Sequence, residues 1–335
     1  MAVNRFDQLI NAWDPKLRKA FLDAVYAMRN AADISKIAER LEKGDVDGAI
    51  RAVGLDPTQF RIFDKTITEA FEAGGVYTGN SIPSYRDGQG FRVRFQFNIR
   101  NPAAENWLRN HSGNLIRDVL DDQRQMIRNV MRDGMVAGAN PRTKALDLVG
   151  RVGASGNREG GMIGLTDSQT QWVKAYEAEL RSDRPGAALE RALRDTRFDG
   201  TVVRAAKEGR TLTASEIEPM VKAYTNRALR YRAETIARKE AITALHEAQE
   251  QAMRQAIGSG AIVQSAVTYT WRSAHDKRVR DAHRQLDGVS VADGEVFQSI
   301  LGPIRYPGDP FATAANVIGC RCWREPKVDF LAGIR

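Results

Sequence analysis

Three side chains near the C-terminal end of the sequence are of types that bind transition metals. His283, Cys320 and Cys322 combine one imidazole with two thiols, which are the ligands that zinc prefers. On an extended segment Cys320 and Cys322 point to the same face, which suits joint binding of one ion and disfavours a disulfide between them. The pattern predicts either a zinc site or two partly buried thiols that pack the C-terminal region, with His283 hydrogen-bonded to the backbone.

A closed structural zinc site needs four ligands, and these three residues leave one position open. His275, Asp276 and Asp281 lie in the same stretch and each could supply the fourth ligand. No spacing rule selects one of them.

An enzyme offers a second interpretation of the same residues. His275, Asp276 and His283 could hold a hard cation beside an activated water, as in a metal-dependent nuclease. Arg278 and Arg280, together with a third arginine four residues further on, would repel a divalent cation, although they could hold the phosphate of a substrate. We therefore expect no enzymatic activity and keep the nuclease as the alternative function.

A glycine-rich segment covers residues 150–166 and holds six glycines in seventeen positions. A phosphate-binding loop would need GxxxxGK[ST], or GxGxxG between a strand and a helix, and neither pattern is present. The segment is therefore predicted to be a flexible loop, or a hinge at an assembly contact.

Composition narrows the class of protein. The chain has 335 residues, with 50 Lys and Arg against 42 Asp and Glu, which gives a net charge of +8. The basic residues are interleaved with acidic ones, so we expect weak binding to double-stranded DNA without sequence preference. We find no helix-turn-helix signal, which disfavours a regulatory DNA-binding protein.

Location follows from the same sequence. No apolar run is long enough to span a membrane, and the charged N-terminal stretch MAVNRFDQLINAWDPKLRKAF is unlike a secretory signal peptide. Two cysteines cannot form a disulfide framework, so we expect a reducing compartment. Because no segment is predicted to span a membrane, we expect no membrane partner.

Periodicity predicts a mainly α protein with a small mixed α/β C-terminal domain. Residues 1–90 form an N-terminal helical region, in which Asp14-Pro15 opens one helix and Gly74-Gly75 ends another. Residues 91–213 form a middle region that contains the glycine-rich segment. It begins with a strand over 91–99, because apolar and polar residues alternate there, and continues with a helix from Asn101-Pro102 to about residue 134.

One long helix over residues 214–260 is predicted to link the two parts of the molecule. About 40 residues at 1.5 Å each exceed the size of one compact domain of this length. Acidic residues balance its basic residues only in part, so we expect it to contact an acidic partner, either a protein or DNA. The candidate contact residues are Arg227, Arg230, Arg232 and Arg238, to which Arg278 and Arg280 are added further along the chain.

Residues 261–335 are predicted to form the small α/β domain. A strand ends at Trp271, a short helix is closed by Gly288, and the stretch 289–310 looks irregular. The spacing of Asp276 from Arg278 and Arg280 predicts a local ion pair that stabilises a turn.

Several separated motifs together resemble the phage head morphogenesis family, the Mu F-like minor head proteins of tailed bacteriophages. The resemblance covers residues 228–323, and the regions around 101–131 and 158–166 are similar to longer members, whereas residues 1–90 are not covered. The motifs are Tyr231-Arg-Ala-Glu-Thr-Ile-Ala-Arg-Lys-Glu240, Trp271-Arg-Ser-Ala-His-Asp276, Arg278-Val-Arg280, His283, Leu286-Asp-Gly288 and Cys320-Arg-Cys322.

The resemblance implies a structural role. It implies a low-copy virion protein of the head, present in the host cytoplasm during assembly, which acts at the portal vertex and near packaged DNA. The implied partners are the portal protein and the major capsid or scaffolding protein, and no reaction is implied. The nuclease alternative would then act on phage or host DNA.

The resemblance also bears on zinc. Some relatives carry a CxxC before the LDG element and an HxxCRC near the end, which together would supply four ligands. In this chain Arg280 stands at the first cysteine position, His283 at the second, and Val317 at the histidine position. Zinc binding is therefore implied only through His283, Cys320 and Cys322.

Overall fold

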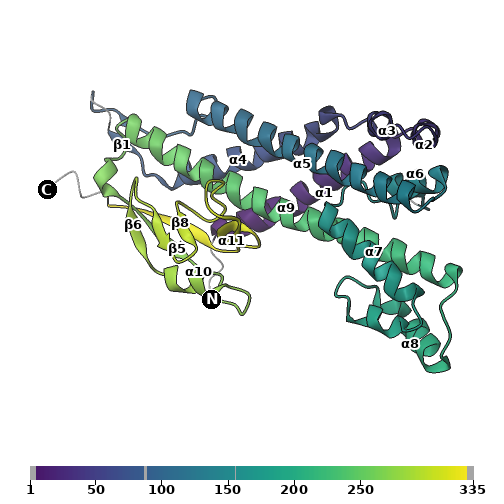
Figure 1. Cartoon of the computed structure of the whole chain (residues 1–335). Helices are drawn as coiled ribbons and strands as arrows, with labels where there is room; N and C mark the ends of the chain where they lie inside the picture. The colour runs from purple at the N-terminus through teal and green to yellow at the C-terminus, as the bar shows by residue number, and fades with distance from the viewer. Residues whose placement is uncertain (1–4, 87–88, 155, 330–335) are drawn as a thin grey trace. The chain divides into compact units, whose positions relative to one another are not determined.

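The computed structural model describes residues 5–86, 89–154 and 156–329 (Figure 1). Helices dominate the described chain and the strands are short, which confirms the predicted fold class. The α-helices are α1 (Arg5–Ala31), α2 (Ile34–Glu42), α3 (Val46–Val53), α4 (Arg61–Ser81), α5 (Pro102–Val136), α6 (Pro141–Val149), α7 (Asp167–Arg181), α8 (Asp199–Glu208), α9 (Ala214–Gly258), α10 (Asp281–Leu286) and α11 (Ala314–Val317). The strands are β1 (Tyr85–Arg86), β2 (Arg92–Val93), β3 (Arg151–Val152), β4 (Arg158–Glu159), β5 (Val267–Arg272), β6 (Ser290–Ala292), β7 (Phe297–Ser299), β8 (Gly302–Ile304) and β9 (Trp323–Val328). The 3₁₀ helices are η1 (Pro57–Phe60), η2 (Pro185–Glu190), η3 (Thr196–Phe198) and η4 (Gln264–Ala266).

The chain forms two compact units. Unit 1 comprises Met1–Ala20, Ile62–Gly113 and Glu234–Arg335, and unit 2 comprises Phe21–Arg61 and Asn114–Ala233. The boundaries fall inside α1, α5 and α9 and after the first residue of α4, so each unit is assembled from segments that are distant in sequence. The four-segment division made from the sequence follows chain order and stays a prediction.

Helix α5 begins and ends close to where its sequence signals indicate. The side chain of Asn101 accepts the backbone N–H of Ala103 at 3.0 Å, and Pro102 occupies the first helical position. The proline of Asp14-Pro15 does not open a helix, however, because it lies inside α1. Phe6 and Ile10, which precede the proline, are both buried. The free energy gained from their burial outweighs the cost of a proline inside the helix, so α1 begins before Pro15.

The Gly74-Gly75 pair, predicted to end a helix, lies inside α4, which continues to Ser81. A Cβ atom on Gly74 would lie 2.9 Å from the carbonyl oxygen of Leu245 in α9, and one on Gly75 would lie 2.2 Å from the ring of Phe97. The two glycines therefore permit close packing against α4. Their helix continues because tertiary contact outweighs their low helix propensity.

The predicted strand over 91–99 was wrong in extent. Only Arg92–Val93 pairs, with Tyr85–Arg86, while Phe91 is 66% exposed. Phe95 is buried and packs over Gly79 of α4. The alternation of apolar and polar residues thus reflects packing against helix α4 and not strand pairing. The backbone of Asn98 is hydrogen-bonded to the side chain of Gln255 and not to a neighbouring strand.

Helix α9 is buried on all its faces within unit 1, from Glu240 to Met253 without interruption. It has the length predicted for the linking helix and runs from Ala214 to Gly258 (Figure 1). Four other segments of unit 1 supply the contacts that cover it. These contacts are Leu245 with Gly74 of α4, His246 with the ring of Phe6 of α1 at 4.9 Å, Glu240 with His111 of α5 at 2.6 Å, and Glu247 with the Tyr306 hydroxyl at 2.5 Å.

The C-terminal strands form the antiparallel sheet β6-β5-β9 and a separate hairpin of β7 and β8. The stretch 289–310, predicted to be irregular, contains three of these strands. Tyr269 and Trp271 of β5 are buried in one apolar cluster with Cys320 and Cys322. The aromatic core thus extends to the two thiols. It also includes Phe297 and Ile304 of the stretch 289–310, whose strands are too short to show a clear alternation in the sequence.

The glycine-rich segment is ordered around Arg29, a side chain of α1 in unit 2. Arg29 is fully buried and donates to the carbonyl oxygens of Ile163 at 2.9 Å, Arg158 at 3.2 Å and Gly161 at 2.5 Å. Strands β3 and β4 pair in the same segment. In its described part the segment is therefore held by a buried cation, in contrast to the predicted flexible loop.

Candidate functional site

The structure brings His283, Cys320 and Cys322 together. His283 comes from α10, and the two cysteines come from the segment between α11 and β9. The Sγ atoms of Cys320 and Cys322 lie 3.5 and 3.6 Å from Nδ1 of His283, and the three ligand atoms all lie within 4.8 Å of one another. All three side chains are buried, so the group forms a compact set of soft donors.

A hydrogen-bond chain determines which nitrogen of His283 faces the thiols. Asn316 donates its side-chain N–H to the carbonyl oxygen of Gly302 at 2.9 Å, which identifies its Oδ1 as an acceptor. The same Oδ1 accepts the Ser299 hydroxyl at 3.0 Å and lies 3.2 Å from Nε2 of His283. Nε2 therefore carries the proton, and the lone pair of Nδ1 points at the two sulfurs.

The two thiols do not ionise alike. A hydrogen bond between them lowers the pKa of Cys320 well below its ordinary value and raises the pKa of Cys322. The backbone N–H of Cys322 also donates to Sγ of Cys320 at 3.5 Å. The group thus favours one thiolate, and a bound cation would favour the second.

The suggested fourth ligands lie elsewhere. His275 has a positive φ of 49° and is half exposed, with Nε2 3.5 Å from Asp287. Asp276 binds the guanidinium of Arg321 through both oxygens, which lowers the pKa of Asp276 to about 2. Asp281 is exposed. Within the described ranges, none of these three belongs to the close group of ligand atoms.

The predicted local ion pair of Asp276 with Arg278 or Arg280 was wrong. The side chain of Asp276 pairs with Arg321, which is 45 positions further along the chain, while Arg278 contributes only a backbone N–H at 2.8 Å. Arg278 is exposed, and the guanidinium of Arg280 donates to the carbonyl oxygen of Ile318. The sequence gives no signal for a pairing of such long range.

Two of the predicted contact arginines on α9 are accessible in unit 2. Arg230 is exposed. Arg227 is partly exposed, where it donates to the carbonyl oxygen of Arg194 and lies 3.3 Å from Asp195. Arg230 is therefore better placed to meet a partner.

The other two arginines on α9 make internal contacts. Arg232 of unit 2 is 6% exposed and donates to the carbonyl oxygen of Gly164 at 3.0 Å. Burial lowers its pKa to about 10. Arg238 of unit 1 donates to the side chain of Asn11 at 2.7 Å and lies 3.7 Å from Asp14. Both guanidinium groups are used inside their own unit.

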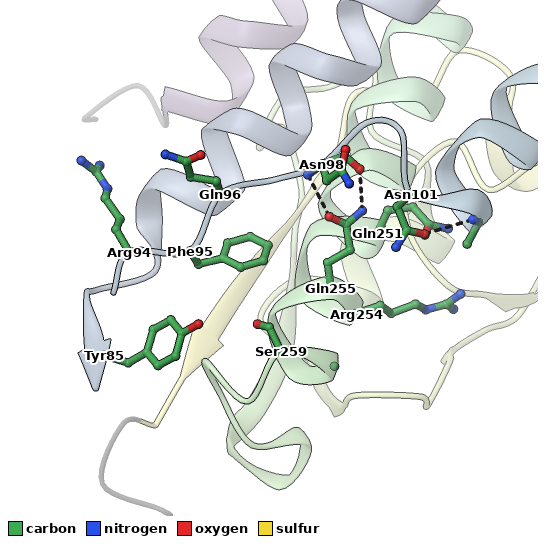
Figure 2. A pocket seen from close by; sticks show the side chains of 12 residues that line it. Tyr85, Arg94, Phe95, Gln96, Asn98, Asn101, Gln251, Arg254, Gln255 and Ser259 are labelled. Carbon is green, nitrogen blue, oxygen red and sulfur yellow. Dashed lines mark hydrogen bonds between the residues drawn. The ribbon is translucent and has the colours of Figure 1, made fainter. Parts of the chain in front are cut away.

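A groove in unit 1 adds residues that belong to no motif of the sequence. It has a volume of about 570 Å³ and lies between the segment 85–103 and the end of α9 (Figure 2). Arg94 and Arg254 line it, both exposed, and Gln255 exchanges two hydrogen bonds with the backbone of Asn98. The arginines at 92 and 94 were the available signal, and they lie in the segment 91–99 that was predicted to be a strand.

Comparison with known families then identifies part of the chain. Residues 196–324 match the family model described as Phage Mu protein F like protein. This region of the chain is similar to the phage Mu F-like family. The predicted resemblance is thereby confirmed, and the Mu F-like region holds all three residues of the thiol and imidazole group. The comparisons with curated proteins and with solved structures gave no match.

The family assignment supports a bacteriophage protein of head morphogenesis, and hence a component of the virion. Among the described residues, no helix combines the length and the apolar character that crossing a membrane requires.

Proposed function

We propose that this chain is a minor head protein of a tailed bacteriophage, which acts at or near the portal vertex and contacts packaged DNA. The observation that carries the proposal is the Mu F-like match over residues 196–324. The portal protein and the major capsid or scaffolding protein are the expected partners. The proposed site of action is the virion head, reached from the host cytoplasm during assembly.

One exposed arginine supports the proposed contact with an acidic partner. Arg230 is exposed in the Mu F-like region, whereas Arg238 is partly buried against Asp14. Charge reversal of Arg230 should therefore weaken incorporation into heads without unfolding the chain, and reversal of Arg238 would mix the two effects. Normal incorporation of Arg230→Glu would remove this residue from the interface.

The proposed DNA contact uses the groove of unit 1. Arg94 and Arg254 supply guanidinium groups there, although Arg254 also lies 3.0 Å from Glu250, and none of the described residues that line the groove is acidic. Phosphate contacts of this kind give binding that is weak, independent of sequence and strongly reduced by salt. Because each lost phosphate contact lowers the salt slope by roughly 0.9, Arg94→Gln with Arg254→Gln should lower it by about 1.8.

A matched control keeps the net charge equal. Arg142→Gln with Arg204→Gln removes two exposed arginines from unit 2 and should leave the slope near that of the wild type. Titration of duplex DNA between about 50 and 200 mM salt measures both variants. Equal slopes for the two variants would place the DNA contact outside the groove.

The proposal as a whole is tested by deletion. A phage that lacks the gene should form fewer DNA-filled heads, and the wild-type chain supplied in trans should restore them, as counted by electron microscopy. Normal heads without the gene would contradict the proposal.

The nuclease alternative is tested with plasmid DNA and magnesium or manganese. We expect no nicking, because Asp276 is held by Arg321 and His283 faces two thiols. Nicking that His283→Ala abolishes would favour the nuclease instead.

A further inference from the structure

The donor atoms of His283, Cys320 and Cys322 have the spacing of ligands around a tetrahedral ion. Zinc bonds of about 2.3 Å to sulfur and 2.05 Å to nitrogen, at a tetrahedral angle, place the two atoms about 3.6 Å apart. The two Sγ–Nδ1 distances are 3.5 and 3.6 Å. The protein alone thus holds these atoms at the separation that one bound ion would require.

The surroundings hold these donors in a form ready to bind a metal. Asn316 fixes the proton of His283 on Nε2 and leaves Nδ1 free, which is the arrangement that outer-shell partners impose on metal-bound histidines. The backbone N–H of Cys322 points at Sγ of Cys320, as suits a thiolate acceptor. Trp271 packs edge-on against His283, and its indole N–H interacts with the side chain of Cys322.

The fourth position is a small space and not a side chain. A cavity of about 10 Å³ adjoins His283, Cys320 and Cys322, and Arg278, Arg280 and Arg321 also line it. That volume is close to the minimum that holds one water molecule. A tetrahedral ion bound here would therefore have one position left for a small ligand.

The charges around this space favour an anion. Two thiolates neutralise a divalent cation, so the metal and its protein ligands together carry no net charge. The three lining arginines add positive charge, and Asp276 balances only Arg321. Arg280 lines the cavity and donates to the carbonyl oxygen of Ile318, so this chain has a cation at the edge of the open position. A small anion would be attracted there because it meets uncompensated guanidinium groups.

We propose that His283, Cys320 and Cys322 bind one zinc ion with three protein ligands, and that its fourth ligand is a water molecule that exchanges for a small anion. The arginines beside the cavity hold that anion. This inference does not rest on the role in head morphogenesis, since it depends only on the geometry of the Mu F-like region. A site of this kind is open, unlike the closed sites with four protein ligands that only stabilise a fold.

The experiment uses the purified full chain. Elemental analysis should find one zinc per chain, and X-ray absorption should find two sulfur ligands and one imidazole. In the cobalt-substituted protein, azide should shift the visible bands of the metal in a saturable manner. Absence of metal, a second imidazole ligand, or bands that azide leaves unchanged would each overturn the proposal.

Variants separate the arginine contribution from general effects. Arg278→Gln combined with Arg280→Gln should weaken azide binding about tenfold, which corresponds to 1.4 kcal/mol. Arg284→Gln is the control for a lost arginine near the site, because Arg284 lies on α10 with His283 but pairs with Asp281 and does not line the cavity. Equal azide affinities for both variants would show that the arginines do not hold the anion.

A second pair of variants tests the fourth ligand without disturbing the core. His275→Ala and Asp281→Asn should keep one metal per chain and the wild-type cobalt spectrum. A changed spectrum in either variant would identify a fourth protein ligand and overturn the open site. Neither side chain is buried, so both variants should fold.

Discussion

The backbone N–H of Arg324 donates to Nε2 of His246 at 3.0 Å, which joins the start of strand β9 to the buried centre of α9. The other ring nitrogen, Nδ1, donates to the carbonyl oxygen of Ile242 at 2.8 Å. His246 is therefore neutral and uses both nitrogens. Burial, followed by the nearby charge of Arg324, lowers its pKa to about 3.

This histidine predicts a pH dependence of stability. Its pKa is about 3 in the folded chain and about 6.5 when unfolded, so below pH 6.5 only the unfolded chain takes up the proton. The stabilisation is present above pH 6.5 and falls, by at most about 1.4 kcal/mol per pH unit, as the pH decreases. Urea unfolding of the wild type and of His246→Asn should therefore give free energies that converge from pH 7 to pH 5. A constant difference would mean that His246 does not titrate this way.

Replacing Gly74 by alanine should lower the stability of the fold, although alanine has the higher helix propensity. Gly74→Ala should destabilise the fold by about 1–3 kcal/mol, because its Cβ would meet the backbone of Leu245. Gly113→Ala is the control, since Gly113 also lies in a helix but has open space around it. That substitution should raise stability by roughly 0.5–1 kcal/mol. Thermal unfolding measures both, and stabilisation by both would contradict the close packing of α4 on α9.

These two cases show what the sequence could and could not predict. Helix periodicity located α5 and α9 well, because their apolar positions recur along many turns. The glycines of α4 and the alternation at 91–99 were misinterpreted for one reason. The environments of Gly74 and Phe95 are determined by contacts with another helix, which a local pattern does not show. Local pattern reports that a residue is buried but not against what.

The residues of the candidate site also fall into those that the sequence indicated and those that it did not. The types and spacing of Cys320 and Cys322 indicated a shared role, and the structure places them beside His283. Asn316, which orients His283, and Arg321, which binds Asp276, carried no signal, since single polar residues separated by tens of positions give no period. Their roles depend on how the strands and short helices fold back.

Arg29 predicts that the glycine-rich segment depends on one buried cation. Arg29→Ala would leave the carbonyl oxygens of Gly161 and Ile163 without a donor, each at a cost of about 1–3 kcal/mol. Limited proteolysis should then cut within residues 150–166. The exposed Arg142→Ala should resist cleavage like the wild type, and equal resistance of the Arg29 variant would contradict this role.

Cys320 predicts a comparable effect in unit 1. Cys320→Ser should destabilise the C-terminal domain by about 1–3 kcal/mol if only packing is lost, and by more if zinc is lost. Cleavage should appear between Val289 and Pro310, because Asn316 beside the same histidine also binds Ser299 and Gly302. A variant that stays resistant to protease but fails in particle assembly would show that the motif acts at a binding surface instead.

The role in the phage head is tested most directly by the protein content of purified particles. Quantitative mass spectrometry of DNA-filled heads should find this chain, at far fewer copies than the major capsid protein, and it should remain through density-gradient purification. Heads that are infectious and contain none of the chain would contradict the account.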